Sequence, residues 1–160
     1  MPQEVTAKDF VDQFFRLWEE MLGTTGPEVE YRFVLDRNAG WADTLSAVDA
    51  EEASRRLIPG GTSIAAQTAH AAYYLELFEA TVLNRHVEAD WPASFQPAEV
   101  DEAAWARERE RFSAVAGRVG ELMRTNPRWE PEHLGGAMSN LAHLAYHLGS
   151  VRQMLRVVKG

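Results

Sequence analysis

The sequence contains no cysteine, which excludes disulfide bonds, thiolate metal sites and a cysteine nucleophile supplied by the protein itself. It also lacks an excess of positive charge, because 16 Lys and Arg residues stand against 24 Asp and Glu residues and the formal net charge is -8. Nucleic acids and anionic membrane surfaces both attract basic patches, so this balance argues against either as a partner.

Long apolar runs are missing as well. No uninterrupted stretch approaches the roughly 20 apolar residues that a membrane-spanning helix needs. The first residues, Met1 to Val5, lack the basic segment and apolar stretch of a secretory signal. We therefore expect a cytoplasmic protein that binds neither nucleic acid nor membranes.

Apolar residues are plentiful enough to build one core. They make up 46% of the 160 residues, and aromatic residues make up 10%, so the composition is that of a folded domain and not of a disordered chain. The sequence has no internal repeat and no low-complexity tract. We expect a single domain over residues 1–160.

Four segments repeat apolar residues at intervals of three and four, which predicts four amphipathic helices. The predicted helices cover residues 6–22, 63–85, 102–124 and a last segment from 133 or 136 to 158. Their predicted inward stripes are, in chain order, Phe10, Phe14, Leu17 and Met21; Ile64, Thr68, Ala71, Leu75, Phe78 and Val82; Trp105, Phe112 and Val119, with Val115 and Leu122 beside them; and Leu141, Leu144, Leu148, Val151, Leu155 and Val158. A short helix is predicted at 49–57, and some helix is expected to begin near Trp41.

Capping residues support these boundaries. Thr6 with Asp9 three residues later is typical of a helix start, and either Thr62 or Ser63 caps the second long helix. The connections 23–62 and 86–100 are too long for simple hairpins, so we expect crossovers or loops that cover one end of the molecule. The predicted fold class is all-α, a four-helix bundle with long crossover connections.

The histidines are the candidate functional residues. His143 and His147 are four residues apart on the last predicted helix, so their imidazoles project from the same face, as in HxxxH zinc motifs. Each precedes a leucine of the inward stripe by one residue, and His70 precedes Ala71 in the same way. Three imidazoles on the flanks of two apolar faces predict a divalent metal site. A histidine beside an apolar face is also often only a packing residue. His86 and His133 are predicted at a helix end or in a loop, so they are not candidate ligands.

Residues 62–70 combine a helix start with a single histidine, and residues 140–149 place Gly149 two residues after the HxxxH pair. These stretches and the following 151–153 resemble the DinB-like family, also called YfiT-like, over nearly the whole chain. The resemblance implies an up-down-down-up bundle, a three-histidine site for a divalent ion such as zinc or nickel, a small-molecule substrate and a homodimer. It also implies kinship with transferases and isomerases that use mycothiol or bacillithiol, and with metal-dependent hydrolases. Ser150 departs from the pattern, because many members carry Gln at this position.

Three protein ligands leave a divalent ion an open position, which is typical of catalytic sites. Such a site can activate water or a thiol of low molecular weight against a small electrophile. Helical spacing makes Gln67, Tyr74, Asn140 and Ser150 candidates to orient an imidazole or to meet a substrate. No carboxylate occupies these flanking positions, so the sequence offers no evident acid or base. Two alternatives to an enzyme therefore remain: a metal-binding or ligand-sensing bundle without turnover, and a purely structural bundle. Tryptophans are more often packing residues than ligand-stacking ones, but Trp41 and Trp91 are expected in loops, where they can also line a pocket mouth.

Overall fold

The protein is all-helical in the computed structural model, which describes residues 4–126 and 130–160, and no strand occurs in these residues. The elements are α1 (Ala7–Leu22), α2 (Trp41–Ser46), α3 (Ala50–Ser54), α4 (Ile64–Val82), the 3₁₀ turn η1 (Ala93–Phe95), α5 (Glu102–Thr125) and α6 (Pro131–Lys159). No helix in this part of the chain combines the length and apolarity needed to cross a membrane.

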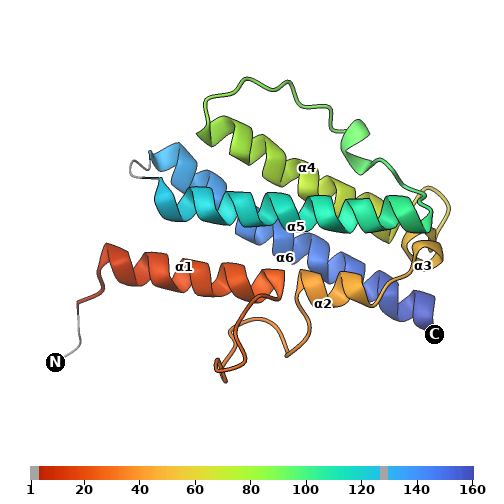
Figure 1. Cartoon of the computed structure of the whole chain (residues 1–160), viewed down its shortest axis with the longest axis horizontal. Helices are drawn as coiled ribbons and strands as arrows, with labels where there is room; N and C mark the ends of the chain where they lie inside the picture. Colours follow the sequence, from red (N-terminus) through yellow and green to blue (C-terminus); the bar gives the residue numbers. More distant parts are fainter. Residues whose placement is uncertain (1–3, 127–129) are drawn as a thin grey trace.

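The four long helices run side by side and make the body of the molecule (Figure 1). α4 and α5 run in the same direction, and α1 and α6 run in the opposite one. A parallel pair needs a connection that returns along the bundle, and the segment between α4 and α5, which contains η1, is that crossover. The segment between α1 and α4 instead contains the short helices α2 and α3.

The predicted caps are confirmed. Thr6 and Asp9 form a reciprocal capping box at the start of α1, and the Ser63 hydroxyl, not that of Thr62, accepts from the backbone N–H of Ala66. Each side-chain oxygen satisfies an N–H that has no partner within its helix.

Three predicted boundaries were wrong by several residues. α4 ends at Val82 instead of 85, because Asn84 adopts a left-handed backbone conformation with φ 54°. α3 ends at Ser54 instead of 57, since Arg55 is extended. α6 begins earlier than predicted, at Pro131, where proline suits the first turn because its missing N–H is not needed there.

The inward stripes of α4 and α5 are confirmed, since all of their predicted residues are buried except Leu122, which is half-buried against the core. The stripe of α1 was partly wrong. Phe10 is 49% exposed, and the buried apolar face consists of Phe15, Trp18 and Met21. The apolar residues of α1 cover more than one face, so their spacing alone does not say which face the rest of the bundle covers.

The helix expected to begin near Trp41 is confirmed, but the expected place of this residue at a pocket mouth was wrong. It is the first residue of α2 and is fully buried, with its ring 4.6 Å from that of Phe112. Its indole N–H donates to the carbonyl oxygen of Leu144 at 3.2 Å, which attaches α2 to α6. A buried indole needs such a partner, so Trp41 belongs to the core and not to a pocket mouth.

The loop between α1 and α2 is organised by a buried carboxylate. Glu20 is 2% exposed and accepts the backbone N–H groups of Phe33, Val34 and Leu35. Burial alone would raise the pKa of Glu20, but these three donors outweigh it and the pKa is lowered. At the ends of this loop Gly23 and Gly40 meet so closely that a Cβ on Gly40 would lie 2.4 Å from the Gly23 backbone.

Candidate metal site

The structure brings the three predicted histidines together. His70 comes from the middle of α4, and His143 and His147 come from adjacent turns of α6. Each offers one nitrogen to a group whose atoms all lie within 4.8 Å of one another, and this group could hold a metal ion. The Nε2 atoms of His143 and His147 are 3.0 Å apart.

His70 is fixed by the crossover segment. Its Nδ1 lies 2.7 Å from the hydroxyl oxygen of Ser94, and its ring stacks on Phe95 with 4.0 Å between centroids and 6° between planes. The Ser94 hydroxyl donates to the carbonyl of Trp91 at 2.6 Å. Its single proton is therefore used, so Ser94 accepts from His70 Nδ1–H, and the Nε2 lone pair of His70 is free.

Side-chain hydrogen bonds attach η1 to α4. The Asp90 carboxylate accepts the backbone N–H of Ala93 at 3.0 Å, and the Asp90 N–H donates to the Tyr73 hydroxyl at 2.8 Å. Ser94 and Phe95, which both contact His70, were not predicted from the sequence as parts of the site. The prolines on either side mark a compact turn, but nothing in the local pattern indicates which helix face the turn covers.

His147 is held by a second hydrogen-bonded chain. The side-chain oxygen of Gln67 accepts from His147 Nδ1, and the Gln67 amide nitrogen donates to the Thr62 hydroxyl at 2.7 Å. The bond to Thr62 orients the amide so that its oxygen faces the imidazole. His147 therefore carries its proton on Nδ1 and, like His70, directs an unprotonated Nε2 toward the other histidines.

His143 is held by stacking instead. Its ring lies 3.9 Å from that of Tyr74 at 17° between planes, and the Tyr74 hydroxyl lies 3.0 Å from that of Ser139. Its Nδ1 is buried without a hydrogen-bond partner. Since His147 Nε2 is unprotonated, His143 Nε2 is the donor of the contact between the two rings. Moving that proton to Nδ1 would free the third lone pair.

The site favours neutral imidazoles. Burial, followed by the influence of His70, lowers the pKa of His143 to about 4. Burial, followed by the influence of His143 and then His70, lowers the pKa of His147 to about 3. Burial also lowers the pKa of His70. Neutral imidazole is the form that binds metals, so the rings are in the required state over the ordinary pH range.

The remaining predicted candidates differ in their positions. Gln67 and Tyr74 contact the histidines directly. Asn140 is buried and donates to the Gly136 carbonyl at 2.8 Å, while its side-chain oxygen has no partner. Ser150 uses its hydroxyl within α6, where it donates to the Tyr146 carbonyl at 3.2 Å. Trp91 is 48% exposed and its ring lies 6.3 Å from that of His70, so of the two tryptophans expected near a pocket mouth it is the one beside the site.

The donor set fits a divalent ion. Two of the three rings have an anchored Nδ1–H, and the unpartnered Nδ1 of His143 can take up the proton that its Nε2 must lose. Two nitrogens that share a zinc ion, each about 2.1 Å from it, cannot be more than about 4 Å apart. The span of up to 4.8 Å therefore requires only a small inward movement of the rings.

Aromatic rings dominate the surroundings of the histidines. Phe95, Tyr74, Trp91 and Tyr146 make ring contacts with them, and no charged side chain of the described residues is bonded to them. This agrees with the absence of a flanking carboxylate in the sequence. No family model, no curated protein and no solved structure matches this chain.

Proposed function

We propose that this protein is a metal-dependent enzyme of the DinB-like type, in which His70, His143 and His147 hold a zinc or nickel ion. Its reaction is the transfer of a low-molecular-weight thiol, such as mycothiol or bacillithiol, to a small electrophile, or the hydrolysis of one. The convergence of three neutral imidazoles from two helices is the observation that carries this proposal. The resemblance of residues 62–70 and 140–149 to DinB-like sequences supports it.

An ion bound by three imidazoles would supply a Lewis acid with an open coordination position for water or a thiol. Residues around the histidines would hold the imidazoles in the protonation state and orientation that metal binding needs. Ser94 and Gln67 keep a proton on Nδ1 of His70 and His147 and so keep each Nε2 unprotonated. Phe95 and Tyr74 cover two ring faces, which keeps water away from them and limits ring rotation.

Metal content tests the first half of the proposal. The protein purified without chelator should contain about one divalent ion per chain, or take one up from zinc or nickel, by elemental analysis. His147→Ala should lose this ion, whereas His86→Ala, which removes a histidine outside the group, should keep it. A wild-type content near zero that zinc and nickel do not change would refute the proposal.

Turnover tests the second half. Mycothiol, bacillithiol and glutathione would be offered with a panel of electrophiles, and ester or amide substrates would be offered without thiol. Activity should depend on added zinc or nickel, vanish in His147→Ala and survive in His86→Ala. Activity that is equal in both variants would exclude these histidines from the reaction.

A metal-binding or ligand-sensing bundle without turnover is the second candidate. It is favoured by one observation, the lack of a charged side chain bonded to the histidines among the described residues, which leaves no evident acid or base. It predicts one metal ion per chain, loss of that ion in His147→Ala and no turnover in any of the assays above.

The resemblance to DinB-like proteins also supports a homodimer. Light scattering during size-exclusion chromatography measures the mass directly. A mass near twice 18.0 kDa is expected, and a mass of one chain at all concentrations would contradict it.

A further inference from the structure

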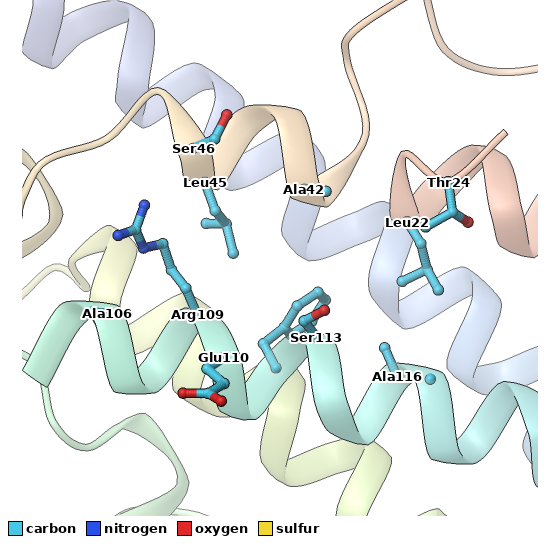
Figure 2. A pocket seen from close by; sticks show the side chains of 12 residues that line it. Leu22, Thr24, Ala42, Leu45, Ser46, Ala106, Arg109, Glu110, Ser113 and Ala116 are labelled. Atoms are coloured by element: carbon cyan, nitrogen blue, oxygen red, sulfur yellow. The ribbon is translucent and has the colours of Figure 1, made fainter. Parts of the chain in front are cut away.

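We propose that a groove between α2 and α5 is a second binding site, one that takes a small amphipathic carboxylate such as a medium-chain alkanoate. The groove has a volume of about 490 Å³ and is lined by the end of α1, by α2 and by the middle of α5 (Figure 2). Ligand sites for small molecules typically have about 300–1,000 Å³. The proposal is independent of the metal site, whose ligands lie on α4 and α6.

The groove exists because the facing turns of the two helices carry small side chains. Its apolar floor is made by Leu45 and Phe112, which are both 3% exposed, and by Ala116. Along its sides the small residues are Ala42 on α2, and Ala106 and Gly117 on α5. These residues leave space above an apolar surface that larger side chains would have filled, and burying that surface under a hydrocarbon chain is favourable.

Arg109 places an unpaired positive charge at this groove. Its Nε is buried without a hydrogen-bond partner, and its guanidinium lies 5.7 Å from the ring centre of Trp105. By contrast, Arg111 of α5 bonds Glu76 and Glu108, and Arg118 bonds Glu79. A guanidinium that lines the groove without an ion pair can bind an anion through its terminal N–H groups.

The charged side chains that line the groove favour a ligand with one negative charge. Among the described residues that line it, Arg109 is the only cationic side chain, and the next residue, Glu110, contributes a carboxylate. One guanidinium opposed by one carboxylate suits a ligand with a single negative charge better than a dianionic phosphate. An apolar floor next to one guanidinium therefore matches an alkyl chain that ends in a carboxylate.

Octanoate is the probe for this site. Titration of the whole chain would be followed by tryptophan fluorescence, because Trp105 lies under Arg109 and Trp41 contacts Phe112 of the floor. Octan-1-ol keeps the alkyl chain but lacks the carboxylate, and acetate keeps the carboxylate but lacks the long alkyl chain. Each should bind at least about tenfold more weakly than octanoate. No saturable octanoate signal, or equal affinities for octanoate and octan-1-ol, would overturn the proposal.

Two variants locate the probe. Arg109→Gln should weaken octanoate binding at least about tenfold, whereas the neighbouring exposed Arg107→Gln, with the same change in charge, should leave it unchanged. Gly117→Leu should also reduce binding, because Gly117 lines the groove and a Cβ there would meet nothing within 4 Å.

Gly135→Leu is the matched control, since a Cβ at Gly135 is equally unobstructed and this residue lies outside the groove. Both glycines lie inside helices, where leucine is the better helix former, so a loss of binding in Gly117→Leu cannot be ascribed to a weaker helix. Wild-type affinity in Arg109→Gln or in Gly117→Leu would place the ligand elsewhere and overturn the assignment.

Discussion

Replacing Gln67 by leucine tests whether the hydrogen bonds around the histidines prepare them for a metal. Gln67 is not a candidate ligand, and it acts only through His147, whose Nδ1–H its side-chain oxygen accepts. Leucine has a similar size and no acceptor. The substitution therefore leaves His147 in place on α6 but leaves its Nδ1–H without a partner and its ring free to change tautomer.

The structure sets the expected size of two effects. His147 is 5% exposed, so its unpaired N–H should cost about 1–3 kcal/mol of unfolding free energy in the metal-free protein. Partial exposure of Gln67 places the cost toward the lower end, because water can replace part of the bond. For a chain of this size each 1 kcal/mol lowers the melting temperature by about 2–4 °C. Loss of a partner that orients a metal-binding histidine typically weakens metal affinity by about 10–100-fold.

Zinc affinity would be measured by competition with a chromophoric chelator, and the melting temperature would be measured with EDTA and with zinc. Gln67→Glu keeps an acceptor for His147 and should retain most of the affinity. Gln153→Leu, at an exposed position of α6, controls for the change of an amide to an alkyl group. Wild-type zinc affinity in Gln67→Leu, or an equal loss in Gln67→Leu and Gln67→Glu, would refute the reasoning.

Two further predictions concern the fold. The folded pKa of Glu20 is below its ordinary value of 4.5, so its contribution to stability is complete above that pH and is lost as the pH falls through the folded pKa. Glu20→Gln should cost about 1.5–3 kcal/mol at pH 7 in urea unfolding, and this difference from wild type should shrink below about pH 4; a constant difference would contradict the assignment. Gly135→Ala should stabilise the protein by up to about 1 kcal/mol. Gly136→Ala should destabilise it by about 1–3 kcal/mol, because a Cβ there would lie 2.6 Å from the Phe78 ring; equal melting temperatures for the two variants would show that Phe78 moves aside freely.

Local sequence was sufficient to predict the helices and part of the site. Helical geometry alone places His143 and His147 on one face, because residues four apart lie on adjacent turns. The caps at Thr6 and Ser63 follow from short-range hydrogen bonding for the same reason. The structure brings His70, which the sequence placed beside the apolar face of its helix, to the pair on α6.

The tertiary structure decided what surrounds those histidines. Ser94 and Phe95 reach His70 only because the crossover returns along α4, and no periodicity in residues 83–101 indicates that path. The sequence likewise did not decide whether Trp41 packs in the core or lines a pocket, and it placed the exposed Phe10 on the inward face. Spacing along a helix specifies which residues share a face, because it depends on backbone geometry within a few turns. It does not specify which neighbour covers that face, because that depends on the free energy of packing segments that are distant in the chain.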